Sequence, residues 1–257
     1  ARPDLPRGVC AAIAEVGDEA NIVLLLENET AGINRTSLNR ICERFGHVAQ
    51  VRALLLLRES LPGQARHVLV TEVTQALAQS GLVQKTIAPS RIDVMTREAG
   101  EDAAIAIAGS MPQDEIPALV EHLRVCGKLT PALLIHALSS GRIEFFATAI
   151  IALVDLDERR IRAILSTGRA HAVRALFEAA GIGRSTVAVF VEAVFLWRRA
   201  AGAGLGETCY AALLRTFAVE RDRNGAINEL LEMVEQLHRH ELRRNARSYA
   251  CEIALVA

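Results

Sequence analysis

Residues 138–142 read Leu138-Ser139-Ser140-Gly141-Arg142, and 27 residues later the chain reads Leu165-Ser166-Thr167-Gly168-Arg169. On the same shift, Leu129-Thr130 returns as Leu156-Asp157. A looser third copy begins at Ile182-Gly183. A period of this length accommodates two helices of about 11 residues and two turns. The second half of the chain is therefore predicted to consist of repeated helix pairs.

Capping residues stand at the ends of these predicted helices. Thr130-Pro131 and Asp157-Glu158 are each an N-cap residue followed by a good first helical residue. Gly141 and Gly168 stand where a helix is predicted to end. Glycine tolerates the left-handed conformation that terminates many helices, because it lacks a Cβ atom. We therefore predict a left-handed C-cap at both glycines.

The first half carries a weaker repeat. Leu5, Ile33 and Leu61 are 28 residues apart, and on the same shift Glu15 matches Glu43. Apolar residues recur at the helical spacing of three and four, as in the rows Leu38, Ile41, Phe45 and Val48, Val51, Leu55. No stretch alternates convincingly between apolar and polar residues, so no sheet is expected.

A pair of short helices cannot bury its apolar face alone and must stack on its neighbours. The predicted fold is therefore all-α: an α-solenoid of HEAT-like helix-pair repeats of 27–28 residues, irregular in the middle, with C-terminal capping helices. The predicted regions are N-terminal helical repeats at 1–80, a linker and long connecting helices at 81–128, C-terminal helical repeats at 129–201, and capping helices at 202–257.

Finer expectations concern the irregular middle and the end of the chain. We expect a linker from Gly81 to Pro89, followed by a long helix from Ser90 to Ala108. After a glycine-rich linker at 202–206, we expect two helices, at 208–220 and 226–244. The terminal helices of a solenoid need a polar outer face, which suits a capping role.

Composition narrows the class of protein. Of 257 residues, 51% are hydrophobic and 23% are charged, which excludes intrinsic disorder as the main state. The net charge of −1 argues against a general nucleic-acid coat, because such proteins carry clustered positive charge. The chain contains two lysines, Lys85 and Lys128, and 27 arginines, and we attribute this bias to genomic base composition. The longest apolar run, from Phe145 to Val154, is about half as long as a helix that spans a membrane.

The five cysteines are odd in number and far apart. They fit neither a disulfide framework nor a CxxC metal site, and they favour a reducing cytoplasm. The N-terminus lacks the layout of a signal peptide. It begins with Ala1 inside what resembles a repeat turn, so we expect the chain to be part of a longer protein.

Repeated charges mark the candidate interaction surface. Glu15 and Glu43 occupy equivalent repeat positions, and so do Arg142 and Arg169, which follow the predicted glycine caps. Such charges can form a ladder along one face of a solenoid. They can equally be satisfied within ion pairs, for example by Arg40, which lies three residues before Glu43. We favour the ion-pair interpretation and keep the ladder as the alternative.

A basic segment near the C-terminus supplies three further candidates, Arg239, Arg243 and Arg244. At the end of the predicted helix, these positive charges suit the helix dipole as a solvated final turn. The alternative is a patch that binds an acidic partner or a phosphate.

No sequence-local group assembles a catalytic or metal site. His122 and Cys126 are four residues apart and can face the same way, but zinc takes three or four protein ligands. We therefore interpret this pair as part of a half-buried helix face. The chain contains no P-loop, GxSxG or HExxH motif. We assign no catalytic, cofactor-binding or metal-binding residue and expect no cofactor.

Four segments carry a family resemblance: Ile13-Ala14-Glu15-Val16-Gly17, Ile41-Cys42-Glu43-Arg44-Phe45-Gly46, Leu129-Thr130-Pro131-Ala132-Leu133-Leu134, and Arg174-Ala175-Leu176-Phe177 with Ala180-Gly181. They resemble an uncharacterised alphaproteobacterial domain family of unknown function. The resemblance spans most of the chain and is weakest after about Arg199. It implies a bacterial, cytoplasmic, helical protein and supplies no catalytic residue.

The function expected from these patterns is that of a non-enzymatic protein-interaction scaffold or regulatory helical-repeat protein. Stacked helix pairs form a long groove that suits a partner helix or an extended peptide. Two alternatives stay open: a HEAT-like nucleic-acid-binding protein, and a sensory module that binds a small ligand within Gly81–Cys126. We expect a protein partner, no membrane association and no nucleic acid; the oligomeric state is left open.

Overall fold

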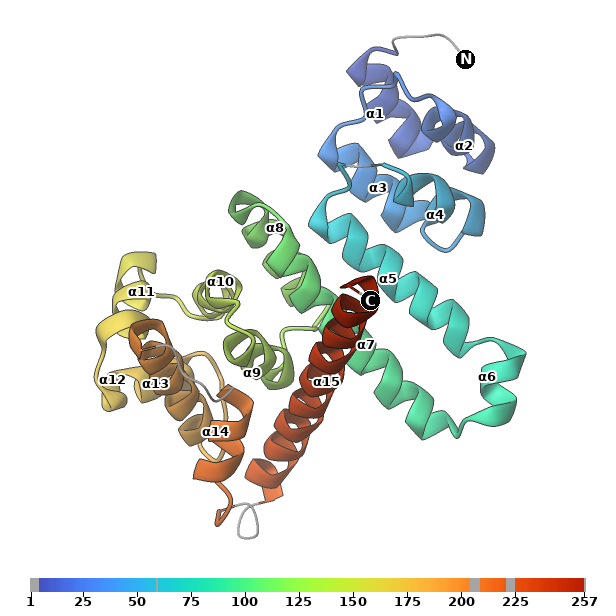
Figure 1. The fold of residues 1–257 in the computed structure, drawn as a ribbon. Coiled ribbons are helices and arrows are strands. Elements are labelled where there is room, and N and C mark those ends of the chain that lie inside the picture. Colours follow the sequence, from blue (N-terminus) through green and yellow to red (C-terminus); the bar gives the residue numbers. More distant parts are fainter. Residues whose placement is uncertain (1–4, 59, 204–208, 221–224, 257) are drawn as a thin grey trace. The chain divides into compact units, whose positions relative to one another are not determined.

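A computed structural model describes residues 5–58, 60–203, 209–220 and 225–256; within these ranges, no side chain is described at 201–203, 241, 244, 245 and 247–256 (Figure 1). The described residues form fifteen α-helices and one 3-10 helix, and no strand occurs among them. The all-α prediction is therefore confirmed. The chain divides into two compact units, Ala1–Leu119 and Val120–Ala257.

The first unit contains α1 (Arg7–Val16), α2 (Glu19–Glu27), α3 (Arg35–Phe45), α4 (Ala49–Leu56), α5 (Gly63–Ala78), α6 (Gly81–Thr86), α7 (Pro89–Ser110) and the 3-10 helix η1 (Gln113–Glu115). Helix α8 (Ile116–Val125) begins in the first unit and ends in the second. The second unit continues with α9 (Pro131–Ser139), α10 (Ile143–Leu153), α11 (Glu158–Thr167), α12 (Ala170–Ala179), α13 (Val187–Ala203), α14 (Cys209–Thr216) and α15 (Gly225–Val256).

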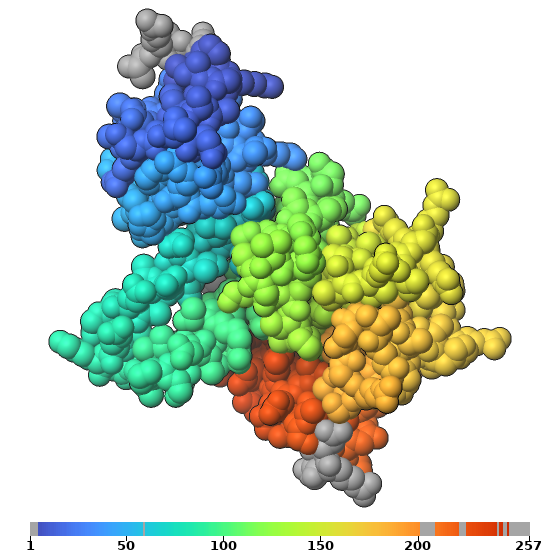
Figure 2. All heavy atoms as spheres, turned by 180° about the vertical axis from the view of Figure 1, so that it is seen from behind, coloured from blue at the N-terminus to red at the C-terminus, as the bar shows by residue number. Residues whose placement is uncertain are grey.

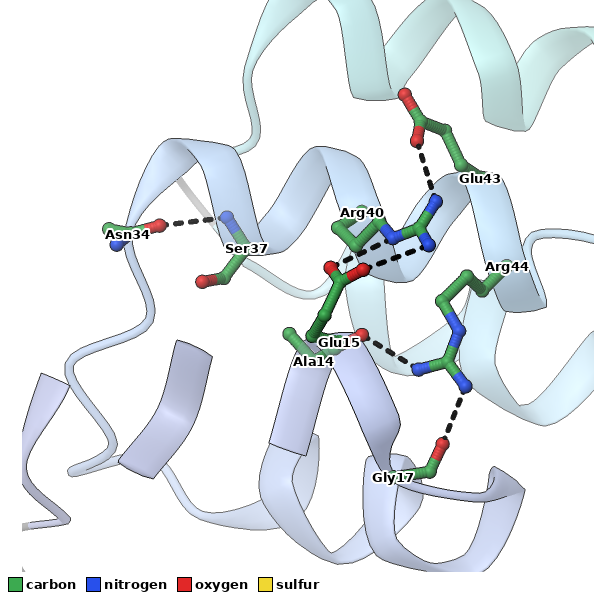
Figure 3. A network of polar contacts seen from close by, with 8 residues as sticks. All are labelled: Ala14, Glu15, Gly17, Asn34, Ser37, Arg40, Glu43 and Arg44. Atoms are coloured by element: carbon green, nitrogen blue, oxygen red, sulfur yellow. Dashed lines mark hydrogen bonds and ion pairs between the residues drawn. The ribbon is translucent and has the colours of Figure 1, made fainter. Parts of the chain in front are cut away.

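Helices two apart in the chain pack together in the first unit: α1 on α3, α2 on α4, and α3 on α5. Cys10 of α1, Leu38 of α3 and Leu69 of α5 are all buried. Asn34 caps α3 by accepting a 2.7 Å hydrogen bond from the Ser37 amide (Figure 3). The core of this unit is therefore shared between successive helix pairs.

Helices α5 and α7 pack along each other, and α6 joins them (Figure 1). The expected linker from Gly81 to Pro89 is largely helical, because α6 occupies Gly81–Thr86. The prediction overlooked Ser80, whose hydroxyl oxygen caps α6 by accepting a hydrogen bond of 3.4 Å from the Val83 amide. The long helix predicted to follow is α7.

Helix α13 is central to the core of the second unit, where it packs on α9, α12 and α14. Phe146, Phe177 and Phe190 come from α10, α12 and α13 and are all fully buried. Their rings meet edge to face, with centroid separations of 6.0 and 5.8 Å. These aromatic side chains therefore serve the core rather than the surface.

Gly141 and Gly168 differ, although the repeat predicted one conformation for both. Gly141 has a φ of +70°, and the Arg142 amide donates a 2.8 Å hydrogen bond to the Ala137 carbonyl, as a left-handed cap requires. Gly168 has φ −63° and ψ 147°, so the left-handed prediction is wrong there. Space requires glycine instead, because a Cβ atom would lie 2.5 Å from the Ile164 carbonyl oxygen.

The last two helices differ in length from the prediction. Helix α15 packs on α14 and α9 and continues to Val256, twelve residues beyond the predicted end at Arg244. No Gly or Pro follows Arg244 to stop the helix. Tyr210 of α14 is buried and shares a 2.8 Å hydrogen bond with the Ser140 hydroxyl, just after α9.

Candidate interaction surface

The structure brings the repeat positions Glu15 and Glu43 to either side of Arg40 (Figure 3). Arg40 forms two 3.0 Å hydrogen bonds with the Glu15 carboxylate, and its third nitrogen lies 3.6 Å from Glu43. The hydrogen bond and charge of Glu15 raise the pKa of Arg40. These two glutamates are therefore engaged in ion pairs across α1 and α3, and they do not stand as a free acidic ladder.

Amide side chains extend this polar row from α3 to α5. Gln64 of α5 donates to Glu43 at 3.4 Å and accepts a 3.1 Å hydrogen bond from the Asn39 amide. The row follows the α1–α3–α5 stack and joins neighbouring helices through polar contacts.

The predicted candidates Arg142 and Arg169 occupy equivalent places in the second unit. Each is the N-cap residue of a helix, α10 for Arg142 and α12 for Arg169, and each is exposed. Neither guanidinium forms an ion pair or hydrogen bond within the described part of the chain. Both are therefore available to a partner, although nothing draws them together into one site.

The C-terminal candidates lie inside a helix, contrary to the expected helix end. Arg239 pairs with Glu235 one turn earlier, and Arg243 is exposed. The side chain of Arg244 lies outside the described residues. Because α15 continues to Val256, the favourable interaction expected with a helix C-terminus does not apply to these arginines.

Two arginines that the sequence did not single out close the ends of helices in neighbouring layers. Arg44 donates hydrogen bonds of 2.8 and 2.9 Å to the main-chain oxygens of Ala14 and Gly17, at the end of α1 (Figure 3). Arg198 likewise donates to three main-chain oxygens at the end of α11, including that of Gly168 at 2.7 Å. The last carbonyls of a helix lack intrahelical partners, and the fork of an arginine can satisfy several at once.

The same two arginines share a second feature. The guanidinium of Arg44 lies 4.7 Å from the ring centroid of Phe45, and that of Arg198 lies 4.8 Å from the ring of Phe195. Burial lowers the pKa of Arg198, which nevertheless stays charged at neutral pH. A sequence signal was present, since Arg44 follows Gly17 by 27 residues and Arg198 follows Gly168 by 30, close to the repeat period.

The segment from Val70 to Ala103, hereafter the arm, covers the C-terminal half of α5, all of α6 and most of α7. No residue of the arm is buried. Figure 2 shows the arm, in turquoise and green-blue, projecting from the rest of the first unit. The arm is thus a helical hairpin whose two long helices, α5 and α7, pack on each other without burying any of the arm's residues.

Apolar side chains of the arm face solvent. Leu77 is 60% exposed, Leu82 76% and Met95 49%. Single exposed apolar side chains are common on protein surfaces, but several on one segment make it a candidate interaction site. Sequence reasoning missed this surface, because apolar residues at helical spacing look the same whether a neighbouring element covers them or not.

His122 and Cys126 approach each other as their spacing predicted, with 3.9 Å between Nδ1 and Sγ. Within the described part of the chain, no three His, Cys, Asp or Glu side chains gather as a metal site would require. Cys42 has the opposite environment to the exposed Cys126: burial raises the pKa of its thiol to about 12. Cys42 therefore stays a protonated core residue at neutral pH.

Among the described helices, none is both long and apolar enough to cross a membrane.

Comparison with known proteins identifies a family but no characterised relative. No curated protein and no solved structure matches the chain. The predicted resemblance to a family of unknown function is confirmed, and the chain belongs to the family described as "Uncharacterised protein conserved in bacteria (DUF2336)", whose model matches residues 1–247.

Proposed function

We propose that this protein is a non-enzymatic helical-repeat protein that binds other proteins, and that the arm is its binding surface. The observation that carries the proposal is the absence of any buried residue from Val70 to Ala103, in a segment that exposes Leu77, Leu82 and Met95. Exposure of these apolar side chains to water is unfavourable. A partner that covered them would stabilise the complex by about 25 cal/mol per Å² of apolar surface buried.

The body that carries the arm is, in this proposal, a HEAT-like α-solenoid. Stacking of α1 on α3 and of α2 on α4 supports it, because a repeat unit of two helices buries its apolar face only against the next unit. A recurring contact supports it as well: an arginine side chain donates a hydrogen bond to a glycine main-chain oxygen at the end of a helix, from Arg44 to Gly17 and from Arg198 to Gly168. Such stacks are typical of proteins that present extended surfaces to partners.

Nucleic-acid binding receives less support, because many arginines are already engaged. Within the described part of the chain, ion pairs with carboxylates engage Arg35, Arg40, Arg124, Arg162, Arg199 and Arg239. Hydrogen bonds to main-chain oxygens engage others, among them Arg44, Arg52, Arg58, Arg66 and Arg198. The buried phenylalanines of the second unit are also unable to stack on a base.

A small-ligand site in the middle of the chain also receives less support. Such sites enclose most of the ligand surface within a concave, mostly apolar lining. The arm makes up the first part of the predicted region, Gly81–Cys126, and has no buried residue that could form such an interior. The arm therefore suits contact with the surface of a partner better than enclosure of a small ligand.

Paired substitutions test the proposed surface. The arm variant carries Leu77→Glu and Leu82→Glu, which place two negative charges on the arm. The control variant carries Leu24→Glu in α2 and Leu57→Glu at the end of α4, where the leucines are 58% and 79% exposed. We expect the arm variant to lose the proteins that co-purify with the wild type from its native host, and the control variant to keep them. Circular dichroism checks that both variants are folded. Loss from both variants alike, or from neither, contradicts the proposal.

A further inference from the structure

Four residues of α7 form a stripe along one side of the arm: Arg91, Val94, Met95 and Glu98. Their spacing of three, four and seven residues places them on a single helix face. Val94 is 38% exposed and Met95 49%, although both are apolar, and Arg91 is exposed as well. The stripe therefore has a partly exposed apolar centre between two residues of opposite charge, the exposed Arg91 and the half-buried Glu98.

The order of these charges makes the stripe complementary to itself. Arg91 lies toward the end of the arm where α6 is, and Glu98 lies two turns farther along α7. Within the described part of the chain, neither side chain forms an ion pair or hydrogen bond. When two such stripes meet in antiparallel orientation, each Arg91 faces a Glu98 and the apolar centres meet each other. A parallel meeting would instead place like charges together.

We propose that the arm binds a second copy of this chain, through antiparallel pairing of α7 with α7 about a two-fold axis between Val94 and Met95. This inference rests on the proposed function and names the occupant of the arm. Two-fold interfaces are self-complementary: if Arg91 of one copy contacts Glu98 of the other, the reverse contact forms as well. Apolar contact supplies the attraction, and the two ion pairs fix orientation and register.

Charge exchange tests this pairing without touching the core. Arg91→Glu places a second carboxylate opposite Glu98, and Glu98→Arg places a second guanidinium opposite Arg91, so each single variant has two repulsive contacts. The double variant exchanges both signs and restores both attractions. A mixture of the two single variants likewise restores both attractions, but only between unlike chains. Arg97→Glu is the matched control, because Arg97 is an exposed arginine of the same helix outside the stripe.

Sedimentation velocity across a concentration series measures the outcome, and circular dichroism confirms helical content. We expect the wild type, the double variant and the Arg97→Glu variant to reach twice the chain mass of 27.8 kDa. Each single variant should stay at the monomer mass, and their mixture should recover the dimer. The pairing is overturned by a wild type that stays monomeric throughout, or by single variants that dimerise like the wild type. If the wild type is monomeric while arm substitutions still remove other co-purifying proteins, self-pairing fails and the proposed function stands.

Discussion

Arg198 donates a 2.7 Å hydrogen bond to the main-chain oxygen of Gly168. Its other two guanidinium nitrogens donate to Ile164 and Leu165, so one side chain satisfies the end of α11. Arg44 acts in the same way on the end of α1, through Gly17. Lysine has no planar fork and cannot reproduce this pattern, so at these positions arginine has a structural role beyond the base composition of the genome.

Replacing Arg198 with lysine should lower the free energy of unfolding by about 2 kcal/mol, because charge-assisted hydrogen bonds to main-chain oxygens are lost. Chemical denaturation followed by circular dichroism measures the change. Arg199→Lys is the control, since Arg199 is exposed and pairs with Glu192 at the surface. Equal stability of the two variants would show that the Arg198 contacts contribute nothing specific.

Two glycine substitutions should have effects of opposite sign. Gly168→Ala places a Cβ atom 2.5 Å from the Ile164 carbonyl oxygen and should destabilise the fold by roughly 1–3 kcal/mol. Gly100→Ala in α7 meets no atom within 4 Å and should stabilise it by about 0.5–1 kcal/mol, because alanine loses less backbone entropy in a helix. Thermal unfolding measures both, and a Gly168→Ala protein as stable as the wild type would refute the steric argument.

The buried thiol of Cys42 should make stability fall at alkaline pH. Its pKa is raised from 9.0 to about 12 in the folded chain, so between these values the unfolded chain releases a proton that the folded chain keeps. The free energy of unfolding should therefore fall with rising pH across this range, at up to about 1.4 kcal/mol per pH unit from this group. Comparing wild type with Cys42→Ala by denaturation at several pH values isolates the contribution.

Alkylation provides an independent check on Cys42. In mildly alkaline buffer, the exposed Cys126 should react with iodoacetamide while Cys42 stays unmodified until the protein is unfolded. Peptide mass spectrometry distinguishes the two sites. Rapid native labelling of Cys42 would mean that its thiol is neither buried nor protonated.

Local signals in the sequence predicted the helices well. Thr130 and Asp157 cap α9 and α11 as expected, each accepting a hydrogen bond from the amide three residues later. The 28-residue shift correctly paired Glu15 with Glu43, which meet at Arg40. These features depend on neighbours in the chain or on the repeat period, and both can be read directly from the sequence.

Features that depend on what covers a residue were not predictable in this way. Leu69 and Leu77 both lie on α5, yet Leu69 is buried and Leu77 is 60% exposed, because the α1–α3–α5 stack ends between them. Gly168 and Gly141 occupy equivalent repeat positions and differ in backbone conformation. The carbonyl of Gly168 also accepts a hydrogen bond from Arg198, thirty residues away in the sequence.

Site-specific photocrosslinking in the native host tests the central claim most directly. A photoreactive residue replaces Leu82 on the arm or, in the control, Leu57 after α4; these side chains are 76% and 79% exposed. We predict covalent protein adducts from position 82 and none from position 57, with an adduct of two chain masses if the arm binds its own copy. Adducts at position 57 without any at position 82, or equal yields at both, would contradict the assignment of the arm as the binding surface.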